Sequence, residues 1–286
     1  MGKRFLSYGG VLAAVVAAVL AFFLLHSAIA EEKPEKTSAS NEAAGDLPAR
    51  LIWKPDGALM VKVPAGEFTM GATKNANEKP PHKVKLETFY IDRTEVTFKR
   101  FIKFCKETGR KLPLDVLLSE TFPEERLSHP VANVTWKDAR DYCEWAQKRL
   151  PSEAEWEKAC RGSQNLAYPW GNGWNQSACT NRINSNDQTT PAGARNSCKS
   201  PCGAMDMAGN VWEWTADWYK SYRGAPFSFD YTGKKRVARG GAFFYSIDLL
   251  RCSSRHPLPP DDFSDHGGFR CAVSPGKDFR EKIEKP

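Results

Sequence analysis

Signatures of several familiar enzyme classes are absent from this sequence. It contains no HExxH zinc motif, no P-loop, no GxGxxG dinucleotide fingerprint and no GxSxG nucleophile elbow. No repeat with a period of about 20 to 50 residues is visible, which argues against a solenoid or propeller. Because these motifs are absent, the sequence gives no support for a zincin, for a protein with either nucleotide-binding motif, or for an α/β-hydrolase.

A strong excess of one charge is absent as well. The 286 residues include 41 Lys and Arg against 34 Asp and Glu, a formal charge of +7. The basic residues are spread along the chain, so we expect no nucleic-acid partner. Hydrophobic residues make up 41% and charged residues 26% of the chain, as in a globular protein. The length allows one large domain or two small ones.

The first 30 residues have the organisation of a targeting segment. Lys3 and Arg4 form a positive start, residues 9–25 are apolar, and Ala28-Ile29-Ala30 offers small residues for cleavage. The apolar run is long for a signal peptide and short for a spanning helix, so a signal peptide and an N-terminal membrane anchor both remain open. Either way, this segment engages the membrane during export. We expect the protein to be periplasmic, or membrane-anchored and facing the extracytoplasmic side.

Large apolar residues are scarce from residue 31 to about residue 50, which predicts a disordered linker. We expect a domain at 51–275 and a basic C-terminal tail at 276–286. The exported part holds eight cysteines, and an even count there favours disulfides, although about 105 pairings are possible. Cys198-x3-Cys202 lacks a second pair or a histidine at ligand spacing, so zinc is not expected.

Alternation of apolar and polar residues predicts strands in four places. Residues 58–71 alternate around a Pro-Ala-Gly turn and suggest a hairpin, and residues 83–92 alternate as a single strand. Residues 236–245 and 267–273 suggest two short strands later in the chain. Between residues 172 and 203 the chain is rich in Asn, Ser and Gly, which predicts a polar loop.

Three helices are marked by their ends or their apolar stripes. Residues 98–105 place apolar side chains on one helical face, and Gly109 fits the C-terminal cap. Thr135 with Asp138 can start a second helix, and the Ser152–Glu155 capping box a third. Residues 110–128 show no period and are expected to be an irregular insertion.

A stretch near position 210 combines oxygen donors with two tryptophans. Asp206 and Glu213 supply carboxylates, and the carbonyls of Gly209 and Val211 lie between them in the sequence. Calcium prefers six to eight mixed oxygen ligands of this kind, with a glycine that lets the backbone turn. The alternative is an ordinary turn that leads into a strand with buried tryptophans.

The motifs of the chain, in this order, resemble those of the formylglycine-generating enzyme, or sulfatase-modifying factor, family. The resemblance implies a single irregular α+β domain, the family's variant of the C-type-lectin-like fold. The motifs are Pro64-Ala-Gly-x-Phe-x-Met-Gly71, Asp92-x-Thr-Glu-Val-Thr97, His129-Pro-Val-x-x-Val-x-Trp136, Lys148-Arg-Leu-Pro-Ser-Glu-Ala-Glu-Trp-Glu157, Pro169-Trp-Gly171, Asp206-Met-Ala-Gly-Asn-Val-Trp-Glu-Trp214, Arg239-Gly-Gly241 and Gly268-Phe-Arg-Cys271.

The resemblance also implies structural calcium. Asp206, Gly209 (carbonyl), Val211 (carbonyl) and Glu213 match the ligands of one family site. Asn181 matches the first ligand of a second site, for which Asn184 and Asp187 compete in a shortened loop.

Two disulfides follow from the same resemblance, Cys143 with Cys271 and Cys160 with Cys252. The pairing of the other four cysteines stays open: Cys105, Cys179, Cys198 and Cys202.

The catalytic part of the resemblance fails. The formylglycine-generating members follow a Gly-Gly pair with a serine and then two cysteines that bind copper(I), an ion that prefers thiolates. Here Ala242 stands at the serine position and Tyr245 at the first cysteine position, and the second cysteine is lost in a shorter loop. Copper is therefore not expected, and the sequence identifies no catalytic residue.

Other cleft candidates lie in the loop from residue 256 to residue 266. His256, His266 and Asp261 could form a two-histidine, one-carboxylate iron site, for which nothing else in the sequence argues. The alternative is a solvated polar loop with Pro-Asp turns. Ala242 and Tyr245 complete the set of residues expected at the family's cleft.

Two functions from different classes remain open. The first is an exported, oxidoreductase-like enzyme that modifies a peptide or a secondary metabolite. The second is a non-catalytic, calcium-stabilised binding or assembly module of the cell envelope. Both predict a peptide, protein or small-molecule ligand in the family's cleft.

Overall fold

The structure, a computed structural model, describes residues 47–119 and 121–286. The targeting segment at 1–30 and most of the linker expected at 31–50 therefore lie outside the described residues. Residues 46–286 form one compact unit, and every sheet, apolar cluster and disulfide described below lies inside it. This unit thus has what a domain needs to fold on its own. Within the described part, no helix is long and apolar enough to cross a membrane.

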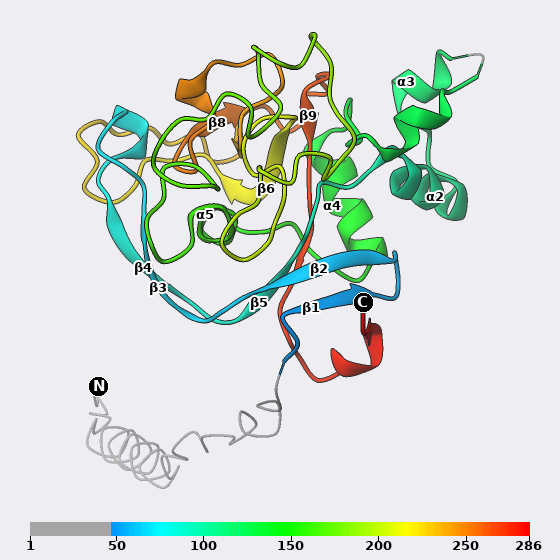
Figure 1. Cartoon of the computed structure of the whole chain (residues 1–286), viewed down its shortest axis with the longest axis horizontal. Coiled ribbons are helices and arrows are strands. Elements are labelled where there is room, and N and C mark those ends of the chain that lie inside the picture. Colours follow the sequence, from blue (N-terminus) through cyan, green and yellow to red (C-terminus); the bar gives the residue numbers. More distant parts are fainter. Residues whose placement is uncertain (1–46, 120) are drawn as a thin grey trace, which may run out of the picture. The chain divides into compact units, whose positions relative to one another are not determined.

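A five-stranded antiparallel sheet, seen with its strands β1, β2 and β5 in Figure 1, joins the two ends of this unit. Its order is β10-β5-β2-β1-β11. β11 pairs with β1, and the buried Phe279 ring packs on Trp53 and Tyr90. The segment expected to be a basic tail at 276–286 instead closes this sheet. The strands are β1 (Arg50–Trp53), β2 (Ala58–Val63), β5 (Phe89–Asp92), β10 (Ala272–Val273) and β11 (Ile283–Glu284).

The hairpin expected across residues 58–71 is wrong. β2 pairs with β5, whereas β3 (Gly66–Met70) pairs with β4 (His82–Leu86) in a separate two-stranded sheet. The strand expected at 83–92 is likewise broken into β4 and β5. Both breaks lie at one place, where the Ala65 N–H donates to Thr88 Oγ1 at 3.1 Å. Alternating polarity identified the strands, but it carries no information about which strand is the partner.

The three expected helices are confirmed, and each begins where a side chain caps it. Thr97 caps α2 (Phe98–Thr108), which ends at Gly109 with φ 69°. Capping boxes start α4 (Trp136–Trp145) and α5 (Glu153–Arg161). Within the insertion expected at 110–128, the described residues form the short helix α3 (Leu114–Leu117) and the 3₁₀ turn η2 (Glu124–Ser128). The other 3₁₀ turns are η1 (Ala76–Glu78), η3 (Ile247–Leu249) and η4 (Arg280–Lys282).

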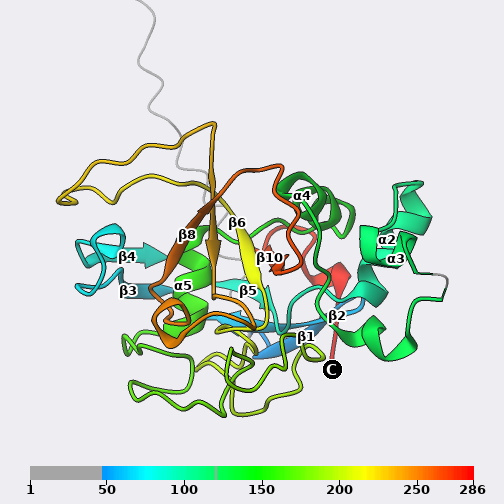
Figure 2. The ribbon, with the colours of Figure 1, turned by 90° about the horizontal axis from the view of Figure 1, so that it is seen from above.

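A four-stranded sheet lies next to α5 and carries the tryptophan-rich stretch (Figure 2). Its order is β8-β7-β6-β9, with β6 parallel to β9 and antiparallel to β7. From the end of α5 to the start of β6 the described chain forms no helix or strand, in agreement with the polar loop expected there. The strands are β6 (Trp212–Trp218), β7 (Arg236–Arg239), β8 (Arg255–Leu258) and β9 (Gly267–Gly268).

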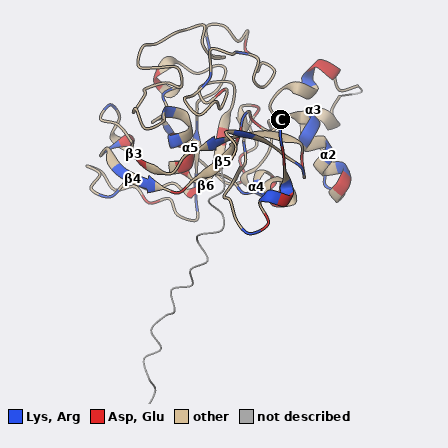
Figure 3. Ribbon diagram, turned by 60° about the horizontal axis from the view of Figure 1, so that its bottom comes forward, with Lys and Arg blue, Asp and Glu red and all other residues tan. Residues whose placement is uncertain are grey.

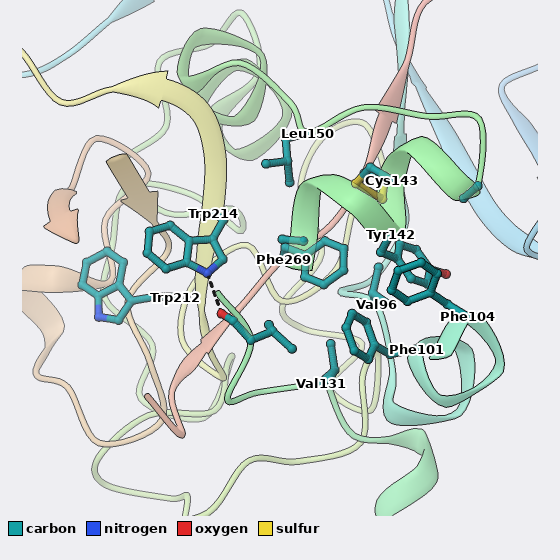
Figure 4. Close-up of a cluster of buried hydrophobic side chains, with 14 of the residues drawn as sticks. Val96, Phe101, Phe104, Val131, Tyr142, Cys143, Leu150, Trp212, Trp214 and Phe269 are labelled. Atoms are coloured by element: carbon teal, nitrogen blue, oxygen red, sulfur yellow. Dashed lines mark hydrogen bonds between the residues drawn. A yellow bond between two sulfur atoms is a disulfide. The ribbon is translucent and has the colours of Figure 1, made fainter. Parts of the chain in front are cut away.

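Three disulfides tie the helices and loops to the later strands. Cys143 of α4 bonds Cys271, and Cys160 of α5 bonds Cys252, which confirms both pairs implied by the resemblance. A third disulfide joins Cys179 to Cys198 within the polar loop. Cys105 and Cys202 are free. Figure 4 shows the largest core, where Tyr142 stacks on Phe101 at 5.8 Å and the Trp214 indole donates to the Val134 carbonyl at 3.0 Å.

Candidate functional site

The stretch before β6 is held in place by its backbone. Gly209 has φ 84°, and a Cβ there would lie 1.8 Å from the Thr180 carbonyl oxygen, so only glycine fits. The Gly209 N–H donates to the carbonyl of Gly240 at 2.8 Å, and the Asn210 N–H donates to that of Thr180 at 3.0 Å. Residues 206–214, which we call the central motif, are therefore clamped between the polar loop and the Gly240-Gly241 turn.

Glu213 is committed to an ion pair rather than left for a metal. The Arg270 guanidinium donates to both of its oxygens, at 2.6 and 2.7 Å, and the Trp156 indole donates at 2.8 Å. Both partners of the ion pair are fully buried. Although burial opposes ionisation, the Glu213 charge and its hydrogen bonds raise the pKa of Arg270. Because Arg270 already balances the charge of Glu213, the expected role of Glu213 as a calcium ligand does not fit.

Asp206 lies beside a second buried carboxyl, that of Glu95. Burial raises the pKa of Asp206 to about 6, although the Gly193 N–H donates to it at 2.5 Å. Burial, and then the charge of Asp206, raises the pKa of Glu95 well above its usual range. Among the described residues, Glu95 Oε2 has no hydrogen-bond partner, while the amide of Asn210 donates to Oε1 at 3.0 Å. Two carboxyls this close oppose each other's ionisation, which a cation bound between them would offset.

The second calcium site expected in the polar loop is not assembled. The Asn181 amide donates to the carbonyls of Gln176 and Cys179, both at 2.8 Å, and its oxygen accepts the Ile183 N–H. Asp187 is exposed. Asn181 therefore serves to close the loop, and Asp187 does not join it.

The residues expected at the cleft gather only in part. Tyr245, His256 and His266 come together with Trp212 and Phe244, and we call these five rings the aromatic wall. His256 stacks on Trp212 at 5.0 Å, and Tyr245 meets the same indole edge-on at 5.6 Å. Phe244 stacks on Tyr245 at 4.5 Å and meets His266 edge-on at 4.9 Å. Strand β6, the loop before η3, strand β8 and the residue before β9 each contribute at least one ring.

The aromatic wall also contains polar groups, namely one indole N–H and two imidazoles. Trp212 is fully buried, and its indole N–H has no hydrogen-bond partner in the described chain. Burial, followed by the nearby His266 and Lys235, lowers the pKa of His256, which favours the neutral imidazole. His266 Nδ1 lies 2.9 Å from a carboxylate oxygen of Asp265. The wall thus offers flat apolar faces, a buried donor and a neutral base.

Two expected members of the cleft lie outside the wall. Ala242 is fully buried in the core, where it accepts the Tyr245 N–H at 3.0 Å. Asp261 is exposed and lines a shallow groove of about 380 Å³ with Pro259, Asp262, Phe263 and Ser264. In the part of the chain that the structure describes, no three His, Cys, Asp or Glu residues are grouped to hold a metal. The iron site considered for His256, His266 and Asp261 is therefore not formed.

The thiols do not supply a copper site either. Six of the eight cysteines are in disulfides. Cys105 packs in the core of α2 and α4, and burial raises the pKa of its thiol to about 11. Cys202 packs against a different core, where burial also raises its thiol pKa. At the aromatic wall the described residues therefore offer no thiolate pair.

Sequence reasoning missed Glu95, Phe244 and the place of the buried Trp212 in the wall. Glu95 lies inside the Asp92–Thr97 motif, and Trp212 lies inside the central motif, so both positions were noted as family signals. Nothing in the spacing indicated that Glu95 meets Asp206, which is 111 positions later in the sequence.

A single α+β domain with irregular connections and a glycine-clamped central motif defines the class of this protein. Its residues 53–275 match the sulfatase-modifying factor enzyme 1-like domain, so the chain belongs to that family. The fold is the C-type-lectin-like variant of this family.

Three relatives illustrate the range of the family. The formylglycine-generating enzyme of Mus musculus is 30% identical, over 86% of this chain and 82% of the relative. The inactive C-alpha-formylglycine-generating enzyme 2 of Bos taurus is also 30% identical, over 76% of this chain and 89% of the relative. The structure of PvdO from Pseudomonas aeruginosa has a TM-score of 0.66 and 28% identity, over 80% of this chain and 99% of that one.

Proposed function

We propose that this domain binds a peptide or small-molecule ligand on the aromatic wall and does so without copper chemistry. The observation that carries the proposal is the buried Trp212 indole N–H, which has no partner in the described chain, with the rings of Tyr245 and His256 packed on the same indole. A flat group with a hydrogen-bond acceptor would satisfy this donor and stack on the rings. The relatives include a formylglycine-generating enzyme and an inactive one, so family membership does not show whether this chain is an enzyme. The proposal therefore depends on the residues of the site.

An NMR titration tests the proposal. N-acetyl-tyrosine amide supplies a flat ring with carbonyl acceptors, and the nine tryptophans give separate indole N–H signals. The Trp212→Phe variant assigns its signal by removing the indole N–H while an aromatic ring stays at this position. We expect the Trp212 indole signal to move on titration and Tyr245→Ala to weaken binding, while Phe263→Ala, in the neighbouring groove, leaves it unchanged. If only other indole signals move, the ligand binds elsewhere and the proposal is wrong.

Absence of formylglycine synthesis is the second part of the proposal. Tyr245 has a hard phenolic oxygen, whereas copper(I) prefers thiolates, and Ala242 has no hydroxyl to place a substrate. With copper, oxygen, a reductant and a sulfatase-type cysteine peptide, mass spectrometry should find no aldehyde above a copper-only control. Turnover well above that control would contradict the assignment.

A second candidate function is acid–base chemistry on the bound ligand. Its specific support is His256, a neutral imidazole stacked on Trp212 and close to His266. A neutral imidazole accepts a proton at neutral pH, as a general base must. If His256→Ala keeps ligand binding and full turnover of an identified substrate, this role is excluded.

We also propose that one calcium ion stabilises the domain and that the protein is exported. Calcium would be held by Asp206 and Glu95, and it would neutralise two buried carboxylates. Export is supported by the three disulfides, which persist in oxidising compartments, and by the apolar run at residues 9–25. Alkaline phosphatase fused after residue 286 should be active in bacteria and should lose activity when residues 1–30 are deleted, because its disulfides form only outside the cytoplasm. An inactive fusion of the full chain would oppose export.

A further inference from the structure

The connection between β6 and β7 is a long hairpin that extends away from the sheets, at the left edge in Figures 1 and 2. We call residues 220–235 the basic arm. At its base the Tyr219 N–H donates to the Lys235 carbonyl at 2.8 Å, and further out the Ser221 N–H donates to the Phe229 carbonyl at 2.7 Å. Backbone pairing therefore fixes the shape of the arm.

The base of the arm is packed against the domain. The Arg255 guanidinium lies over the rings of Tyr219 and Tyr222, at 4.7 and 4.0 Å. Tyr222 also meets His82 of β4 edge-on at 4.7 Å. Since these contacts hold the base, the residues near the tip are presented to the solvent by a fixed support.

Large apolar side chains lie exposed near the tip. Phe227 is 60% exposed and Phe229 is 37% exposed, and both line a hollow of about 300 Å³ with Lys220 and Arg223. Exposed phenylalanines on a projecting loop lose the burial that usually stabilises them, and such patches mark interaction surfaces. The rings of Phe227 and Phe229 therefore contribute little to the core of the domain.

The basic arm also carries an excess of positive charge. The arm carries four cations, Lys220, Arg223, Lys234 and Lys235, and a single acid, Asp230. Along the labelled elements of Figure 3, by contrast, blue and red segments are interspersed. The partner that complements the arm therefore has an apolar layer beside a layer of negative charge.

We propose that the basic arm docks the domain onto an anionic membrane surface. Phe227 and Phe229 enter the boundary between headgroups and acyl chains, while Lys220, Arg223 and Lys234 lie among anionic headgroups. A membrane is favoured over a nucleic acid or an acidic protein because residues 1–30, through which we propose that the chain is exported, would bring it to a membrane; in this respect the inference rests on the proposed export. This inference is independent of the aromatic wall.

Vesicle sedimentation with residues 46–286 tests the proposal, since this unit lacks the apolar N-terminal run that would bind lipid by itself. We expect binding to vesicles of phosphatidylglycerol and phosphatidylcholine, little binding to pure phosphatidylcholine, and a decline as salt is raised. Replacing Phe227 and Phe229 by Ser, or Lys220, Arg223 and Lys234 by Gln, should each weaken partitioning by roughly tenfold or more.

Matched controls lie on the opposite part of the domain. Leu117→Ser with Leu118→Ser removes two exposed apolar residues next to α2, and Lys103→Gln with Lys106→Gln removes two cations of α2 itself. Both controls should bind as the wild type does. The proposal fails if arm and control variants lose equal affinity, if no vesicle is bound at low salt, or if the arm variants instead lose binding to a single-stranded oligonucleotide. If the single variant Phe227→Ser melts at the temperature of the wild type, its weaker binding reflects lost docking rather than lost folding.

Discussion

Arg270 offers the sharpest test of how the centre of this domain is stabilised. Its guanidinium donates twice to Glu213, and also to the backbone carbonyls of Asp92, Arg93 and Met205 at 3.1, 3.2 and 2.8 Å. It therefore joins β5, the central motif and β6 from the segment just before β10. We predict that Arg270→Met strongly destabilises the domain.

The magnitude follows from what the substitution leaves behind. A buried carboxylate loses its counter-ion, and removal of one partner of a buried ion pair costs about 3–5 kcal/mol. For a domain of this size each kcal/mol corresponds to roughly 2–4 °C, so the melting temperature should fall by about 6–20 °C. Glu213→Gln together with Arg270→Met should restore part of the loss, because position 213 then carries no uncompensated charge.

Urea unfolding of residues 46–286 with intact disulfides measures these free energies. Arg149→Met is the matched control, because Arg149 also pairs through two nitrogens with a carboxylate, that of Glu155, but its side chain is 42% exposed. That variant should lose less than about 1 kcal/mol. Equal losses from Arg149→Met and Arg270→Met would refute the argument from burial.

Three further predictions address the metal, the disulfides and the pH dependence. A chelator should lower the melting temperature of the wild type but not of Asp206→Asn, with about 2.7 kcal/mol at a calcium excess of a hundredfold over Kd; equal sensitivity of the two proteins would exclude Asp206. Cys160→Ala with Cys252→Ala should cost about 4–5 kcal/mol, whereas Cys105→Ser, which opens no bridge, should cost less; the reverse order in urea unfolding would contradict the pairing. For Glu78, burial is outweighed by hydrogen bonds and charge from Arg251, which lower its pKa, so its stabilisation is present above the unfolded pKa and is lost as pH falls through the folded value. Glu78→Gln should flatten the stability profile below about pH 4.5, and an unchanged slope would argue against that ion pair.

The helices were predictable because their signals are local. Thr135 and Ser152 cap the residues that follow them, and the apolar stripe of α2 needs only its own turn to be recognised. The strand partners were not predictable, since an alternating pattern is the same whether β2 meets β3 or β5. The closing of the sheet by β11 likewise depends on β1, which is more than 200 positions earlier in the sequence.

For the candidate site too, the sequence could not predict which distant residues come into contact. The resemblance predicted the bridges of Cys143 with Cys271 and of Cys160 with Cys252, and the structure contains both. Its choice of Asp206 as a calcium ligand stays a prediction. The resemblance also suggested Glu213 as a metal ligand, where the structure has Arg270. Which carboxylate meets an arginine and which meets another carboxylate is decided in three dimensions, so spacing along the chain could not separate the two roles.

The three disulfides are nested in the sequence, with Cys179–Cys198 inside Cys160–Cys252, and both inside Cys143–Cys271. The basic arm at 220–235 lies within the two outer loops. A protease that cuts the exposed tip of the arm would therefore leave two fragments that stay covalently joined by both outer bridges. Such a nicked protein would migrate as one species on a non-reducing gel and as two after reduction.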